Sequence, residues 1–324
     1  PATRGEALEY FKATKGDQPV NDLMDGVDAG WGRVAGGEAI QKMIDSLSAA
    51  FDFLHPEKSV KGLVKLYQSL QSLPNSYWKN KKLAETQQLI EQCSGLFIDA
   101  TTSQQFAVHG DSVRVNFSFN NRLGTDATLT GVSVAAGQQF DTAFSQPLSK
   151  NRNFNFAKTI FVHPGSVITQ PYWLQHTMEE GYFNVKDQQD IGKPDVESTY
   201  WLIANLKIEG QDIVFRKPVK YKFTDPVKGE LYEPLVVIPA VEFDFVGDNN
   251  FSINDSAVKV QVHFKRNLKD STLYTFQVNH SDKWFVDKDN FQYGSWSNPS
   301  NYVSSVFKPR QGNGSLRESI SLTL

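Results

Sequence analysis

The chain has 324 residues, 40% of them apolar and 21% charged, which is ordinary for a folded protein of roughly two or three domains. Its 33 basic residues against 36 acidic ones give a net charge of -3, so the basic surplus typical of nucleic-acid binding is absent. No apolar run is long enough to span a bilayer, and the single cysteine, Cys93, excludes an internal disulfide and a thiolate metal cage.

Residues 1–95 are predicted to form a helical region. Thr3 and Glu6 fit a capping box, so a first helix is expected to run on to Phe11. A loop rich in Gly and Asp follows. Three amphipathic helices are then predicted from apolar residues at three- and four-residue spacing, over residues 40–51, 60–70 and 83–93. Because three helices and a long loop build only a small core, we expect this region to pack against the first β domain or against a further domain.

Residues 96–225 are predicted to form a first β-sandwich. Between Val113 and Phe119 apolar and polar residues alternate, which places one face of a strand in a core and the other in water. Similar segments follow, separated by turn residues, over residues 129–134, 153–161, 200–208 and 214–223. Several short strands at this spacing are typical of an immunoglobulin-like or fibronectin-like sandwich.

Residues 226–324 are predicted to form a second sandwich of the same kind, with the boundary in the turn-rich stretch Asp225–Glu230. Its strands are expected over residues 235–238, 241–245, 258–264, 274–278, 284–286 and 302–307. The sequence begins at Pro1 and stops inside an alternating segment, residues 319–324, so we interpret it as a piece of a longer protein cut within this sandwich. The predicted fold class is therefore mainly β, with an N-terminal α-helical region followed by two sandwiches.

The sequence carries no recognisable catalytic constellation. The six histidines lie far apart, and no nucleophile elbow or phosphate-binding loop is present. His176 with Glu179 and Glu180 is the nearest approach to a metal site, but a solvated loop is the favoured interpretation, because closed sites need three or four convergent ligands. Cys93 lies on the apolar face of its helix and is expected to be a buried structural thiol. We therefore predict no catalytic residue, no metal ligand and no cofactor in this piece.

Aromatic residues in polar loops are the candidate binding groups. They are candidates either for glycan stacking or for interdomain contact, and the set is Gln170, Tyr172, Trp173, Trp284, Tyr293 and Trp296. Pro171 biases Gln170 toward an extended conformation, so this segment is expected to enter a strand. Tyr172 and Trp173 would then point to opposite faces, one of them into the sandwich core. We expect the other to be an interdomain clamp, because bulky aromatic side chains are mostly buried.

Five motifs together resemble the region downstream of the catalytic domain in bacterial PIG-L (LmbE-like) deacetylases of the Bacteroidetes type. They are Thr3–Tyr10, Asp28–Val34, Gln170–Leu174, Ile191–Pro194 and Tyr221–Tyr232, and the resemblance extends to about residue 245. It implies an upstream zinc-dependent domain that removes N-acetyl groups from amino sugars, in a periplasmic, outer-membrane-associated or secreted protein.

The family's metal motif, His-Pro-Asp-Asp, is not kept in this chain. Its nearest strings are His55-Pro-Glu-Lys58 and His163-Pro-Gly-Ser166, which lack the paired aspartates, so no catalytic or metal residue is carried over and zinc is expected only in the upstream domain. The leading hypothesis is a non-catalytic accessory region that supports the deacetylase and binds glycan. The alternative is a protein-interaction scaffold of a cell-envelope protein without sugar affinity. A third hypothesis, a hydrolase in its own right, has no readable nucleophile.

Overall fold

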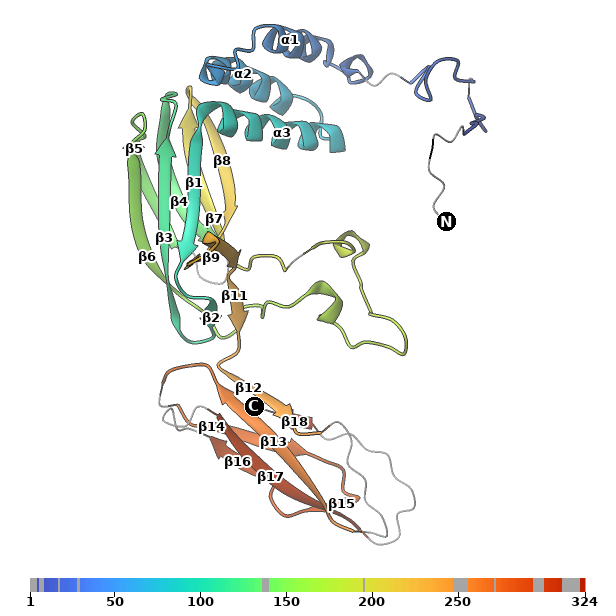
Figure 1. Cartoon of the computed structure of the whole chain (residues 1–324), viewed down its shortest axis with the longest axis vertical. Helices are drawn as coiled ribbons and strands as arrows, with labels where there is room; N and C mark the ends of the chain where they lie inside the picture. The colour runs from blue at the N-terminus through green and yellow to red at the C-terminus, as the bar shows by residue number, and fades with distance from the viewer. Residues whose placement is uncertain are drawn as a thin grey trace.

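The computed structural model describes residues 5, 9–16, 18–27, 30–135, 140–194, 196–247, 256–270, 272–293, 300–310 and 321–323. The fold is mainly β with N-terminal helices, which confirms the predicted class at that level. The helices cover one end of a first β unit, and a second β unit lies at the opposite end (Figure 1).

The helical region holds the three predicted amphipathic helices. They are α1 (Glu38–Ala49), α2 (Val60–Gln71) and α3 (Tyr77–Ser94), with short 3-10 turns at η1 (Trp31–Arg33) and η2 (Pro56–Ser59). The Ser76 hydroxyl caps α3 by accepting from the Lys79 N–H, and Gly95 ends the helix with a φ of 61°.

The expected first helix is not present in the described residues. Its capping box, Thr3 and Glu6, lies outside them, while Tyr10 and Phe11 lie in irregular chain with 91% and 61% of their surface exposed. An isolated short helix is marginal in water, and here no apolar surface covers these two side chains.

The helices pack on the first β unit, as expected. Val60, Leu63 and Val64 of α2 and Ile90 and Cys93 of α3 belong to the same hydrophobic core as the strands. A smaller cluster joins α1 to α2 through Ile40, Leu66, Leu70 and Leu73. The helical region therefore shares the core of the first β unit.

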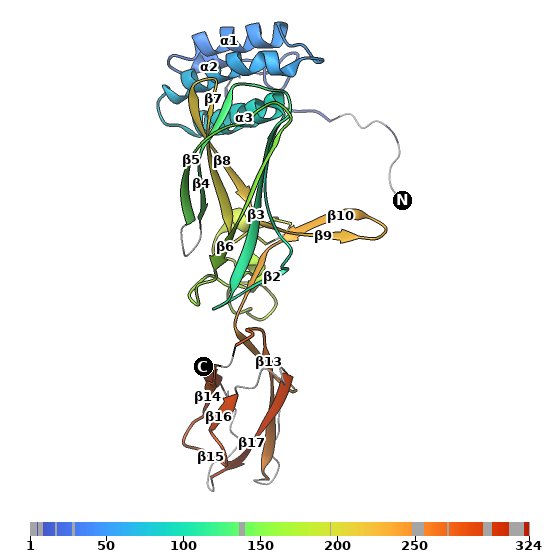
Figure 2. The same cartoon turned by 90° about the vertical axis from the view of Figure 1, so that its left-hand side faces the viewer.

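Two facing sheets build the first β unit (Figure 2). One has the strand order β10-β9-β1-β3-β6 and the other β5-β4-β7-β8. The strands are β1 (Leu96–Thr102), β3 (Ser112–Asn121), β4 (Ala127–Ala135), β5 (Phe140–Pro147), β6 (Asn153–Phe161), β7 (Trp201–Ile208), β8 (Gln211–Pro218), β9 (Lys220–Asp225) and β10 (Gly229–Pro234). Between the sheets lie Phe117 and Phe119 from β3 and Leu129 and Leu202 from the opposite layer, all fully buried.

The segment predicted as one strand over residues 214–223 is two strands in different sheets. β8 pairs with β7, and after Val219 the chain enters β9, which pairs in parallel with β1. Pro218 has no N–H to continue the β8 ladder, so the chain changes partner at that point.

The turn-rich stretch Asp225–Glu230 forms a β hairpin between β9 and β10. The Asp225 carboxylate accepts from the Val227 and Lys228 N–H groups (2.8 and 2.7 Å), and Gly229 takes a φ of 80°. A parallel pair, β2 (Phe106–Val108) with β11 (Val236–Ile238), follows, and Leu235 and Val237 still belong to the first core. The core therefore changes between Val237 and Val241, later in the chain than the expected boundary.

The second β unit has two further sheets. One has the order β12-β13-β17-β15 and the other β16-β14-β18. Their strands are β12 (Val241–Phe245), β13 (Val258–Arg266), β14 (Tyr274–Asn279), β15 (Trp284–Val286), β16 (Asn290–Tyr293), β17 (Ser300–Pro309) and β18 (Ser321–Thr323). Phe264 with Phe276, and Val278 with Phe307, pack side chains of both sheets together.

Candidate functional site

A long arm projects from the side of the first β unit. It comprises residues 163–199 and connects β6 to β7. Its described residues, 163–194 and 196–199, form two short 3-10 turns, η3 (Tyr172–Leu174) and η4 (Gln188–Asp190), and one isolated bridge between Glu179 and Tyr182. Figure 1 shows it reaching away from the sheets on the same side as the N-terminal segment. Connections in compact domains are usually far shorter, and long ones are commonly functional or act as linkers.

The neck of the arm, where Thr169 leaves the first β unit and Thr199 returns to it, is held to β11 by hydrogen bonds. The Thr169 N–H donates to the Val237 carbonyl, and the Val237 N–H donates to the Thr169 hydroxyl, both at 3.0 Å. That hydroxyl also bonds the hydroxyl of Thr199, where the arm returns, at 2.9 Å. His109 adds a contact from its Nε2 to the Ser166 carbonyl at 3.0 Å. The two ends of the arm are thus tied to each other and to a strand.

Tyr172 and Trp173 lie at the start of the arm, but not in the predicted strand. Pro171 is extended (φ -57°, ψ 143°) and precedes the 3-10 turn, which is closed by the Leu174 N–H donating to the Pro171 carbonyl at 2.9 Å. The turn brings the two rings edge to face with their centroids 4.9 Å apart. Both residues are half-buried, so neither enters the core of the first β unit. The prediction of opposite faces was wrong because a turn rotates neighbouring side chains by less than a strand does.

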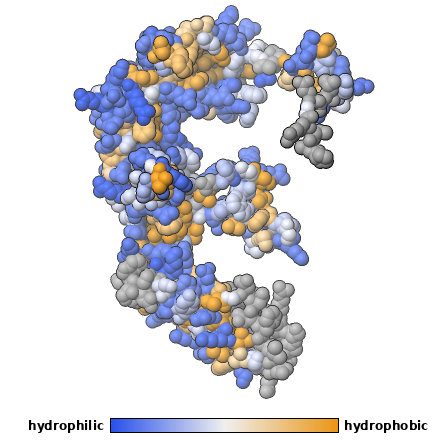
Figure 3. All heavy atoms as spheres, in the orientation of Figure 1, coloured by the Kyte–Doolittle hydropathy of each residue, from blue (hydrophilic) through white to orange (hydrophobic). Residues whose placement is uncertain are grey.

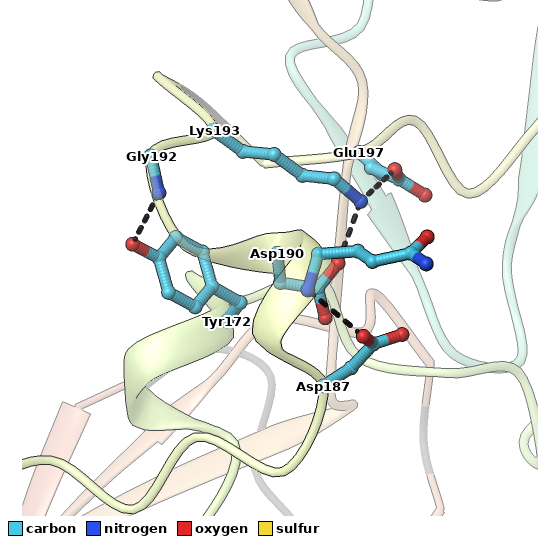
Figure 4. Close-up of polar contacts among 7 residues, drawn as sticks. Tyr172, Asp187, Asp190, Gly192, Lys193 and Glu197 are labelled. Carbon is cyan, nitrogen blue, oxygen red and sulfur yellow. Dashed lines mark hydrogen bonds and ion pairs between the residues drawn. The ribbon is translucent and has the colours of Figure 1, made fainter. Parts of the chain in front are cut away.

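Polar contacts join the two halves of the arm (Figure 4). The Gly192 N–H donates to the Tyr172 hydroxyl at 3.1 Å. The Lys193 ammonium lies 2.6 Å from carboxylate oxygens of both Asp190 and Glu197, and hydrogen bonding, first to Asp190, raises the pKa of Lys193. The arm therefore gains its local order from polar groups.

The apolar side chains of the arm point outward. Every described residue of the arm is exposed or half-buried. The exposed apolar side chains are Val167, Ile168, Leu174, Met178, Tyr182, Phe183 and Ile191, and Figure 3 shows apolar residues over this part of the surface. Sequence reasoning named Tyr172 and Trp173, with Gln170, as candidate binding groups, but none of these exposed apolar side chains. The missed signal is a set of apolar residues without helical or strand period between Pro164 and Pro194.

The remaining candidate aromatics belong to the second β unit in the sequence. Trp284 in β15 is half-buried and packs on Phe307 of β17, with the ring centroids 6.4 Å apart. Tyr293 is the last residue of β16, opposite Tyr274 of β14, and Trp296 lies outside the described residues. Gln170 is exposed at the beginning of the arm, next to the aromatic pair.

The His176–Glu180 loop shows no gathering of ligands. Glu179 instead accepts a hydrogen bond from the Tyr182 hydroxyl at 2.5 Å, and this bond raises the pKa of Tyr182. Within the described residues no three His, Cys, Asp or Glu side chains form a group that could hold a metal ion.

Cys93 is buried, as predicted, and burial raises the pKa of its thiol. In the part of the chain that the structure describes, no helix has the length and apolar character needed to cross a membrane.

Comparison with known proteins does not assign the chain to a family. No family model and no curated protein matches it. Red sea bream transglutaminase aligns with 74% of this chain and 30% of its own length, at 13% identity and a TM-score of 0.30. Alkylpurine DNA glycosylase AlkC of Pseudomonas fluorescens, solved with DNA containing an abasic-site analogue, aligns with 54% of this chain and 50% of its own length, at 6% identity and a TM-score of 0.19. Similarities this weak carry no argument about fold or function.

Proposed function

We propose that this chain is a non-catalytic support and docking region, in which the arm packs against another folded domain. One observation carries the proposal. The arm is held together by polar contacts while its apolar side chains remain exposed, although proteins rarely leave a large apolar surface open to water. Protein interfaces place such side chains at their centre. An arm tied at its neck presents them at a lower entropic cost than a free loop would.

The two β units are proposed to be immunoglobulin-like or fibronectin-like sandwiches. The support is that each unit has two main sheets with buried side chains between them, and that most of the strand pairs are antiparallel. In this interpretation the sandwiches act as a spacer that fixes the position of the arm.

The partner we propose is the upstream catalytic domain of a PIG-L family deacetylase in the same chain. The resemblance rests partly on Gln170–Leu174 and Ile191–Pro194, which both lie in the arm and meet through the bond from Gly192 to Tyr172. Two motifs brought together on a surface arm fit a docking role better than a core role. Zinc would belong to that upstream domain, and a periplasmic, outer-membrane-associated or secreted location is part of the same proposal.

Hydrogen exchange tests this proposal on the natural full-length protein. The arm amides should exchange about tenfold more slowly in that protein than in the 324-residue chain, because docking excludes water. Leu174→Asp should abolish the added protection without unfolding the chain, since Leu174 is exposed. Val227→Asp is the matched control, because Val227 is 93% exposed at the tip of the hairpin between β9 and β10. Equal exchange in the two proteins would contradict docking, and an upstream sequence without a His-Pro-Asp-Asp motif would contradict the named partner.

Glycan binding at the start of the arm is a second candidate function. Its support is that Gln170 is exposed beside the half-exposed pair Tyr172 and Trp173, and an aromatic face next to an amide suits a sugar ring. A glycan array probed with the wild-type chain and with Trp173→Ala tests it. Binding that Trp173→Ala removes would support a platform, whereas no binding at all would leave the scaffold without sugar affinity as the better interpretation.

A further inference from the structure

A cleft of about 590 Å³ lies between α3 and the first β unit. Its walls come from four separate parts of the chain: the second half of α3, the beginning of β1, the residue after β3, and β8. The lining side chains that matter below are Gln87, Gln88, Glu91, Arg122, Arg216 and Lys217. The volume falls within the range of small-molecule sites.

Most of the residues that line the cleft have polar or charged side chains. Its two large apolar lining residues, Leu96 and Phe215, are only 7% and 1% exposed, so they offer little area to a ligand. Glutamine amides dominate the α3 wall, and one of them, Gln87, donates to the Val214 carbonyl at 2.8 Å. Amides both donate and accept, which suits a ligand rich in hydroxyl groups.

The lining side chains carry three positive charges and one negative charge. Lys217 and Glu91 neutralise each other, with 2.6 Å between Nζ and Oε1. Arg122 and Arg216 form no ion pair with any carboxylate in the described part of the chain. The cleft therefore presents an unneutralised charge from two guanidinium groups.

Each guanidinium group lies over an aromatic ring next to the cleft lining. The Arg216 carbon Cζ lies 4.0 Å from the ring centroid of Trp201, and that of Arg122 lies 5.2 Å from the ring centroid of Phe97. Stacking restrains the plane of a guanidinium and leaves its N–H groups at the edge available to a ligand. These N–H groups match the geometry of a carboxylate, which they can bind in a bidentate manner.

We propose that this cleft binds a carboxylate-bearing sugar, such as a hexuronic acid unit of an acidic polysaccharide. The guanidinium groups would bind the carboxylate and the glutamine amides would bind the ring hydroxyls. The cleft involves no residue of the arm, so this inference does not depend on the docking proposed above and its failure would leave that proposal intact.

Calorimetric titration of the 324-residue chain with a galacturonic acid trisaccharide tests the inference. The acidic sugar should bind and a neutral glucose trisaccharide should not. Arg216→Gln and Arg122→Gln should each weaken binding about tenfold, the effect of losing a charge-assisted contact. Arg114→Gln on β3 is the matched control, because Arg114 is exposed and does not line the cleft. Both cleft arginines are exposed, so the variants should fold.

A salt series on the wild-type chain provides a measurement that needs no variant. Binding should weaken steadily as sodium chloride is raised, because exposed charge pairs are screened. Absence of binding by the acidic sugar, or equal binding by the neutral sugar, would overturn the inference. Equal affinity for inorganic phosphate would also overturn it, because the hydroxyl contacts would then contribute nothing. Salt-independent binding, or cleft variants that match Arg114→Gln, would show that the arginines do not hold the ligand.

Discussion

Thr169→Val should loosen the arm at its neck, and the structure sets the size of the effect. The substitution keeps the side-chain shape but removes the hydroxyl that bonds the Val237 N–H at 3.0 Å and the Thr199 hydroxyl at 2.9 Å. Val237 is fully buried, so its N–H is left without that partner away from water. A lost bond with an unsatisfied buried donor costs about 2 kcal/mol.

Urea unfolding and amide exchange measure this prediction. The free energy of unfolding of the first β unit should fall by about 2 kcal/mol, equivalent to a Tm lower by about 4–8 °C, and the Val237 amide should exchange faster. Thr177→Val, at an exposed position in the same arm, should change stability by less than about 0.5 kcal/mol. Thr169→Ser keeps the hydroxyl and should restore most of the loss. If Thr169→Val behaves like Thr177→Val, the neck hydrogen bonds do not hold the arm.

Three further predictions concern other parts of the chain. Asp270→Asn should destabilise the second β unit by about 3 kcal/mol in urea, because it leaves the fully buried Arg266 side chain without its carboxylate. Burial raises the pKa of Asp270, but hydrogen bonds from Thr272 and Arg266 lower it by more, so the folded-state pKa lies below the ordinary value of 3.8. The ionised Asp270 should therefore stabilise the second β unit at neutral pH, and this contribution should be lost only as the pH falls through the lowered pKa. Cys93 should react with a thiol reagent only after denaturation, because it is buried and its thiol pKa is raised. Lys193→Met should speed amide exchange within the arm and leave the Tm of the whole chain unchanged, since its two ion pairs lie within the arm; a lower Tm would show that the arm supports the core.

Local patterns predicted several regular elements well where one face is buried, but they did not single out β1, whose side chains also alternate in burial. The alternation around Val113 to Phe119 and around Val258 to Phe264 corresponds to β3 and β13, each with its apolar side chains in a core. Turn residues were less informative, because Asp225 and Gly229 suit a linker and a hairpin equally. Which strands pair, and where one core ends, depends on contacts between distant segments that periodicity does not encode.

Binding surfaces are harder to predict because long-range folding assembles them. In the arm, the sequence singled out Gln170, Tyr172 and Trp173 as candidate binding groups. The exposed apolar residues follow no period, and the contacts at the neck depend on Thr169 meeting a strand that begins at Val236. The cleft is even harder to predict from the sequence than the arm. Its lining residues lie in and directly after α3, directly after β3 and within β8, and whole strands separate these three places in the sequence. No motif search joins Arg122 to Arg216. Arg122 follows β3 of one sheet and Arg216 lies in β8 of the other, so the two reach one cleft only because the sheets pack around a common core. The α3 helix packs on that core through Ile90 and Cys93, so the same burial that stabilises the helix also supplies the remaining wall of the cleft.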